Sequence, residues 1–136
     1  ARAGARRATR DVGARGGSPG SWGGGAGIAA VGHFTRARAW HLGREGSAVS
    51  CSHPGVTRTE RTAGVLAARA EKDGVTPAEI EARDYAAGAP RTNALGRMVE
   101  ASEVADVAVF LASSQACAMT GELLNPNGGA GNAVYY

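Results

Sequence analysis

The sequence predicts an α/β protein built around a parallel sheet. Helical and strand segments follow one another in the order helix, strand, helices, helix, strand, which is typical of a parallel sheet with crossover helices. Hydrophobic residues make up 43% of the chain and charged residues 20%, so the chain can form a core and is not globally disordered. Its 136 residues amount to one domain or to one half of a larger domain.

The first 27 residues differ in composition from the rest of the chain. They consist mostly of Ala, Arg, Gly and Ser, and Val12 and Trp22 are their only large apolar residues. Because this segment has neither a helical nor a strand period, residues 1–27 are interpreted as a Gly/Arg-rich loop or disordered segment. The predicted folded unit is residues 28–136.

A helix and a short buried strand are predicted at the start of that unit. The helix covers residues 28–42, with apolar side chains on one face, and Gly43 and Gly46 end it. The strand covers residues 47–52, and Pro54 stops it because proline cannot donate a hydrogen bond to a neighbouring strand.

Three further helices and a second strand are predicted downstream. Thr76 can cap a helix, Pro77 suits its first turn, and Glu79 can complete a capping box. The spacing of Val104, Val107, Ala108 and Leu111 is typical of a buried helix stripe. The predicted elements are helices over residues 60–72, 76–87 and 101–113 and a strand over 122–125.

The charge distribution and the cysteines exclude several classes of protein. The net charge is +3, but the first 50 residues hold eight arginines against two acidic residues, whereas the rest is acidic overall. No apolar run approaches the ~20 residues that a membrane span needs. Cys51 and Cys117 lie far apart and form no CxxC pair, so a zinc site or a disulfide framework is not expected. We expect two buried thiols in a cytoplasmic protein.

A succession of short motifs between residues 28 and 129 resembles a known enzyme family. A buried strand runs into Pro54-Gly55 and then Thr59, and Asn127-Gly128-Gly129 follows near the end of the chain. Between and before them stand Gly96-Arg97-x-x-Glu100, Val109-Phe110-Leu111-Ala112-Ser113, Thr120-Gly121 and Ala29-Ala30-Val31 with Phe34-Thr35-Arg36. Together they resemble the C-terminal part of the short-chain dehydrogenase/reductase family. The resemblance implies a partial Rossmann-like fold, the C-terminal half of a doubly wound parallel sheet.

The same resemblance implies a cofactor site at the Pro-Gly turn. It assigns Pro54, Gly55, Val56 and Thr59 to the nicotinamide end of NAD or NADP, with Val56 offering main-chain atoms and Thr59 its hydroxyl. Such a site would lie beyond the carboxyl end of a parallel strand, where sheets of this kind bind ligands. The implied reaction is hydride transfer between NAD(P) and a small carbonyl or alcohol substrate. An ordinary turn remains the alternative for this segment.

The catalytic residues of the family have no counterpart here. Counting back from the long helix places the family's Tyr at Gly24 and its Lys at Ile28, and neither side chain can act as an acid or a base. The catalytic Ser would lie near Asp11 or Val12, where no Ser stands. The glycine run at 23–27 follows no apolar strand, so it is not a dinucleotide fingerprint. We therefore expect no catalytic residue, and a truncated, inactive fragment.

Two other classes of function stay open on sequence grounds. In the family, the helix bearing Phe34 and Trp40 pairs with a second subunit, so the chain could be a noncatalytic subunit of a homo-oligomer; core packing of these side chains is an equal alternative. The arginines at 2, 6, 7, 10 and 15 could form a nucleic-acid arm, although a solvated tail is the favoured interpretation.

The remaining candidate side chains are assigned to packing rather than chemistry. His33 and His41 have no metal-ligand partners at a fitting spacing, and no metal site is expected. His53 precedes the Pro-Gly turn and is interpreted as a packing residue. Tyr85 lies in the segment that covers the substrate in the family, and packing is favoured over pocket lining. Tyr135 and Tyr136 cannot replace the missing Tyr on sequence grounds.

Overall fold

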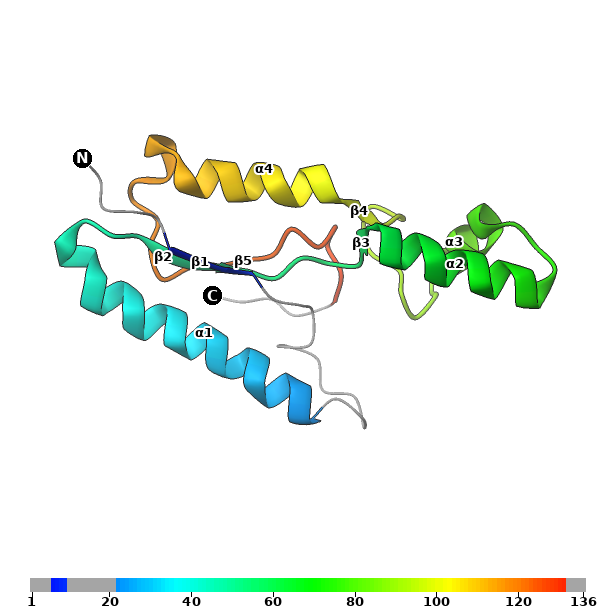
Figure 1. Cartoon of the computed structure of the whole chain (residues 1–136), viewed down its shortest axis with the longest axis horizontal. Coiled ribbons are helices and arrows are strands. Elements are labelled where there is room, and N and C mark those ends of the chain that lie inside the picture. The colour runs from blue at the N-terminus through cyan, green and yellow to red at the C-terminus, as the bar shows by residue number, and fades with distance from the viewer. Residues whose placement is uncertain (1–5, 10–21, 132–136) are drawn as a thin grey trace.

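The computed structural model describes residues 6–9 and 22–131, and its centre is a parallel three-stranded sheet. The strands are β1 (Arg6–Thr9), β2 (Val49–Ser52) and β5 (Leu123–Leu124), in the spatial order β1-β2-β5. Helix α1 (Trp22–Leu42) covers one face and α4 (Ala101–Ala112) lies over the other (Figure 1). The α/β class with parallel strands is confirmed, as is its partial Rossmann-like character.

Helix α1 packs on the sheet through small side chains. Thr35 and Ala39 are 1% and 5% exposed, and a side-chain atom on Gly32 would lie 3.5 Å from Leu123 of β5. Phe34 and Trp40 of the same helix point away from this contact and are 60% and 81% exposed. Packing of these two aromatic side chains in the core of this chain is therefore excluded.

The prediction of loop or disorder across residues 1–27 is wrong in two places. Residues 6–9 form β1, which pairs with β2 in the register Arg6↔Val49 to Thr9↔Ser52. Residues 22–27 form the first turns of α1, although four of them are glycines that each cost ~1 kcal/mol relative to Ala in a helix. For β1, pairing with β2 overrides a weak local preference. The predicted boundary at residue 28 falls inside α1.

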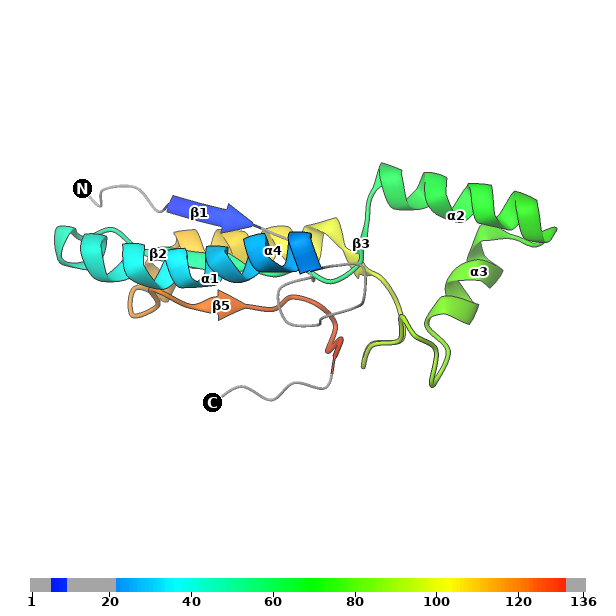
Figure 2. The same ribbon diagram turned by 90° about the horizontal axis from the view of Figure 1, so that it is seen from below.

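A second unit of structure extends beyond the carboxyl end of β2. It contains β3 (Thr57–Arg58), α2 (Glu60–Asp73), α3 (Pro77–Asp84) and β4 (Val99–Glu100), and β3 pairs with β4 in parallel. Figure 2 shows α2 and α3 standing clear of the three-stranded sheet. We call this unit the lobe. Its core is a cluster of buried side chains contributed by Leu66, Ala70, Ile80, Tyr85 and Met98.

Helix caps fix the two helices of the lobe. Thr59 and Thr62 form a capping box at the start of α2, and Gly74, with a φ of 66°, ends that helix. At the start of α3 the predicted box is confirmed: the Glu79 amide donates to Thr76 Oγ1 over 3.2 Å, and the Thr76 amide donates to Glu79 Oε2 over 2.7 Å. Helix α3 ends at Asp84 rather than at residue 87.

The last helix is only partly covered. The four residues of the predicted stripe on α4 are half-buried. No residue of the helix is fully buried, and Val109, outside the stripe, is 67% exposed. A short 3-10 turn, η3 (Ser114–Ala116), leads from α4 toward β5. Cys51 is completely buried in β2, as predicted, but Cys117 is exposed because it follows η3 on the surface. The prediction of two buried thiols is wrong for Cys117.

Candidate functional site

A cavity of about 670 Å³ lies between the Pro-Gly turn and the start of α2. Pro54, Gly55, Val56 and Thr59 all line it, so the four residues assigned to the nicotinamide lie together in space. The other wall is contributed by the lobe, chiefly by Arg61, Thr62, Val65, Leu66, Arg91 and Met98. The volume is within the range of small-molecule sites, roughly 300–1,000 Å³.

The turn is held against the segment that follows β5. The His53 amide donates to Leu124 O over 2.8 Å, and the Gly55 amide donates to Pro126 O over 3.2 Å. A Cβ on Gly55 would lie 2.8 Å from Asn127 Cα and 2.9 Å from Asn127 O. A glycine is therefore required here because two stretches of backbone pass each other closely, a reason that the sequence alone did not indicate.

The hydroxyl groups beside the cavity are already engaged. Thr62 Oγ1 accepts from the Thr59 amide over 2.7 Å, and Thr59 Oγ1 accepts from the Thr62 amide over 3.3 Å. Thr57 Oγ1 donates to Gly55 O over 2.9 Å. Thr59 thus caps α2 while it lines the cavity. Thr59 Oγ1 also lies 3.3 Å from Thr62 Oγ1. As a cap the oxygen uses only a lone pair, so the hydroxyl can turn to donate a hydrogen bond to an acceptor in the cavity.

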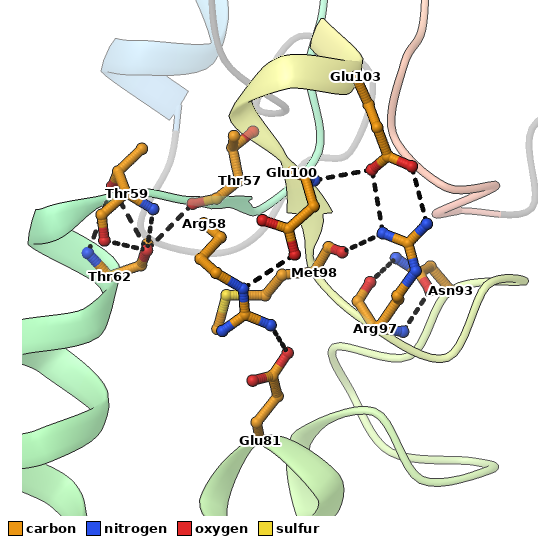
Figure 3. A network of polar contacts seen from close by, with 10 residues as sticks. All are labelled: Thr57, Arg58, Thr59, Thr62, Glu81, Asn93, Arg97, Met98, Glu100 and Glu103. Atoms are coloured by element: carbon orange, nitrogen blue, oxygen red, sulfur yellow. Dashed lines mark hydrogen bonds and ion pairs between the residues drawn. The ribbon is translucent and has the colours of Figure 1, made fainter. Parts of the chain in front are cut away.

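An arginine-centred network joins β3 to α3 and to the start of α4. Arg58 Nη2 lies 2.7 Å from Glu81 Oε1 of α3, and Arg58 Nε lies 2.9 Å from Glu100 Oε1 at the start of α4 (Figure 3). The hydrogen bonds that Arg58 donates to Glu81, and then to Glu100, raise the pKa of Arg58 above its ordinary value. The guanidinium is therefore permanently charged and holds α3 near α4.

A second ion pair fixes the segment that enters α4. Arg97 Nη1 and Nη2 donate to the two oxygens of Glu103 over 3.0 and 2.8 Å (Figure 3). Arg97 Nη1 also donates to Met98 O over 2.9 Å, next to the cavity wall. These bonds from Arg97, together with the Glu100 amide, lower the pKa of Glu103 to about 2. Glu103 is therefore ionised at neutral pH.

Tyr85 contributes to packing and not to the cavity. Its side chain is 6% exposed and belongs to the buried core of the lobe. Burial, followed by the nearby Glu81, raises the pKa of the Tyr85 phenol, so this group stays protonated at neutral pH. Its hydroxyl has no hydrogen-bond partner in the part of the chain that the structure describes.

Other polar candidates lie on β2 and its extension. His53 is 5% exposed; its Nε2 lies 3.7 Å from Cys51 Sγ, and its Nδ1 has no partner among the residues described. Ser50 is buried on the same strand, and its hydroxyl has no partner in the described residues either. Gly24 and Ile28, where the sequence count placed the family's Tyr and Lys, both lie on α1.

Several candidates named from the sequence fall on residues that the structure does not describe. They are Asp11, Val12, Tyr135 and Tyr136, so their positions relative to the cavity are not assigned. Within residues 6–9 and 22–131, no group of three or more His, Cys, Asp or Glu side chains could hold a metal ion. No described helix is both long enough and apolar enough to span a membrane.

Sequence reasoning missed the two arginines of the cavity. Arg61 lies in the first turn of α2, and Arg91 lies in the segment that follows α3. The sequence holds no motif that marks either one, because their proximity depends on how the lobe folds back. The position of Arg61, two residues after the predicted contact Thr59, was the one available signal.

Comparison with known proteins identifies the class. A family model described as enoyl-(acyl carrier protein) reductase matches residues 8–131. The chain belongs to the short-chain dehydrogenase/reductase family. The match begins 20 residues before the predicted start at residue 28, consistent with β1 and the first turns of α1 being part of the fold. No curated protein matches the chain.

Solved structures share the fold over most of this chain. L-sorbose reductase from Gluconobacter frateurii, solved with NADPH and L-sorbose, has a TM-score of 0.79 at 20% identity and covers 96% of this chain. A short-chain dehydrogenase/reductase from Brucella melitensis has a TM-score of 0.68 at 27% identity, over 93% of this chain. A putative β-ketoacyl-ACP reductase has a TM-score of 0.66 at 32% identity, over 90%. The matched part is 48%, 45% and 45% of those chains, so this chain spans less than half their length.

Proposed function

We propose that this chain provides the nicotinamide and substrate side of an NAD(P)-dependent oxidoreductase site that interconverts a carbonyl and an alcohol. The observation that supports the proposal is the joint lining of one cavity by Pro54, Gly55, Val56 and Thr59 beyond the carboxyl end of β2. A nicotinamide cofactor would supply the hydride. The residues described fit the nicotinamide end of such a cofactor, through the backbone of the turn and the Thr59 hydroxyl.

We further propose that the chain does not turn over on its own. Gly24 and Ile28 occupy the positions of the proton-transferring Tyr and its supporting Lys. Glycine has no side chain and isoleucine has no titratable group, so neither can move a proton to a carbonyl oxygen. Cofactor binding without catalysis is the expected behaviour.

Nucleotide titration tests the cofactor role. Titrating NADH or NADPH into the full chain, with nucleotide fluorescence as the signal, should give saturable binding. Thr59→Val removes both the hydroxyl and the cap and should weaken binding, whereas Thr59→Ser keeps both and should restore it. Thr76→Val removes the equivalent cap on α3, away from the cavity, and should leave binding unchanged. No saturable signal up to millimolar nucleotide would refute the proposal.

A noncatalytic role through self-association is the second candidate. Phe34 and Trp40 on α1 and Val109 on α4 are 60%, 81% and 67% exposed. Exposed large apolar side chains favour association, and we propose a homo-oligomer in the cytoplasm. Light scattering should give more than one monomer mass, and Trp40→Glu should shift the mass toward monomer. A monomer at all concentrations tested would rule out this role.

A further inference from the structure

The cavity at the Pro-Gly turn carries an unbalanced positive charge. Two arginines, Arg61 and Arg91, line it, and none of the lining side chains is acidic. The start of α2 carries about +0.5 of an elementary charge, but Glu60 in the first turn opposes it. The two arginines are therefore the source of the cavity's positive charge. A cavity of this kind has a favourable electrostatic environment for an anion.

Arg61 is free to bind a ligand. Its side chain is exposed and makes no hydrogen bond or ion pair with any residue that the structure describes. By contrast, Arg58, Arg69 and Arg97 of the same unit are each paired with a carboxylate at 3.0 Å or less. Arg61 therefore differs from these three arginines in having no ion-pair partner among the described residues.

Arg91 is only weakly neutralised. Its nearest carboxylate is Asp84, where Arg91 Nη1 lies 3.4 Å from Oδ2. Asp84 is already bound by Arg69 through two hydrogen bonds of 2.6 and 2.8 Å, and this bond pair is the main cause that lowers the pKa of Asp84. One carboxylate thus faces two guanidinium groups, and a net positive charge remains at the edge of the cavity.

The opposite part of the cavity is apolar. Val56 and Val65 are 39% and 47% exposed, although both line the cavity, and Leu66 and Met98 close it from the core of the lobe. Exposed valines in a concave site lose contact with water when a ligand's hydrocarbon covers them, which favours binding of an apolar group. The cavity therefore combines an anion-binding edge with an apolar wall.

We propose that the substrate of this site is an anionic, partly apolar molecule. Its carboxylate or phosphate is bound by Arg61 and Arg91, and its hydrocarbon part lies against Val56 and Val65. This inference rests on the proposed function of the cavity and narrows its substrate to a class. The cofactor's own phosphates share the same anionic chemistry, so the test separates the two sources.

Hexanoate and 1-hexanol are a matched pair of probes, with equal chain length and different charge. Each probe is titrated into the full chain, and binding is followed by the methyl and amide NMR shifts of Val56 and Val65. The dissociation constant of hexanoate should be at least tenfold lower than that of hexanol. Arg61→Gln with Arg91→Gln should reduce hexanoate affinity at least tenfold. Arg83→Gln on α3 is the control: this exposed arginine does not line the cavity, and its loss should change nothing.

Equal binding of hexanol and hexanoate would overturn the inference, as would an unchanged hexanoate affinity in the double variant. Repeating the titration with saturating NADPH separates substrate from cofactor. Persistent hexanoate shifts assign the anion to the substrate, whereas loss of these shifts assigns it to the cofactor's phosphate and overturns the inference. If NADPH does not bind while hexanoate binds through the arginines, the anion site stands and the cofactor proposal alone fails.

Discussion

Gly55→Ala tests the close backbone approach at the candidate site. The new methyl group would lie 2.8 Å from Asn127 Cα and 2.9 Å from Asn127 O, and neither backbone atom can rotate away as a side chain could. The φ of Gly55 is not positive, so the whole effect is steric. Overpacking of this kind costs about 1–3 kcal/mol in the free energy of unfolding. We expect Gly55→Ala to lower stability by that amount.

Gly64→Ala provides the matched control. Gly64 lies within α2, its φ is not positive, and nothing lies within 4 Å of an added Cβ. Replacing an exposed helical glycine by alanine stabilises by about 1 kcal/mol. The same chemical change should therefore have opposite signs at the two positions, with a difference of about 2–4 kcal/mol in total.

Urea unfolding followed by circular dichroism measures both variants. A shift of the midpoint without a change of slope reports a change in stability, and a change of slope reports a change in the compactness of either state. If Gly55→Ala is as stable as the wild type, the approach of Asn127 to Gly55 does not constrain this turn, and the explanation for the glycine is refuted.

Three further changes probe the lobe. Thr76→Ala removes the cap of α3 and should lower the free energy of unfolding by about 1 kcal/mol in a urea titration. Ile80→Ala opens a cavity at a residue that is 1% exposed and should cost about 2–5 kcal/mol by the same measurement. Because the pKa of Glu103 is lowered to about 2, its ion pair with Arg97 contributes stability that is present above the ordinary pKa of about 4.3 and is lost as pH falls toward 2. Glu103→Gln should reduce this acid dependence of the urea midpoint.

Conservative variants separate these effects from general damage. Thr76→Ser keeps the capping oxygen and should retain the wild-type midpoint, and Ile80→Val should lose only about 0.5–1.5 kcal/mol. Glu71→Gln removes an exposed carboxylate with no ion pair among the residues described. The urea midpoint of this variant should therefore fall with decreasing pH as the wild-type midpoint does. If the urea midpoint of Glu103→Gln falls with decreasing pH as steeply as that of the wild type, the Glu103–Arg97 ion pair is not the cause of the acid dependence.

Strong local signals made much of the fold predictable. The Thr76-Pro77 start of α3 and the apolar strand before Pro54 each combine hydrophobic pattern with a residue of fixed backbone preference. The same approach failed for β1, where the local sequence carries little strand preference and pairing with β2 decides the structure. It also failed for the first turns of α1, because their glycines locally disfavour a helix. The strands β3 and β4, two residues each, are too short for any period to be visible.

The site was predictable only on its strand side. Pro54, Gly55 and Thr59 are close in sequence, so a motif could identify them together. Arg61 and Arg91 are separated by 30 positions, and only the folding of the lobe brings both to the cavity. Arg61 has no carboxylate partner among the described residues, and Arg91 shares Asp84 with Arg69. These contacts depend on the three-dimensional fold, and no sequence spacing encodes them.

The lobe has its own small core, and this separates its local stability from that of the sheet. Leu66, Ala70, Ile80 and Met98 pack on one another rather than on β2, so α2 and α3 can open as a unit while the sheet stays closed. The cavity has one wall in each unit, from Gly55 on the sheet side to Leu66 on the other. Any molecule bound between them must hold the lobe shut, and it should slow amide hydrogen exchange along α2 more than along β2.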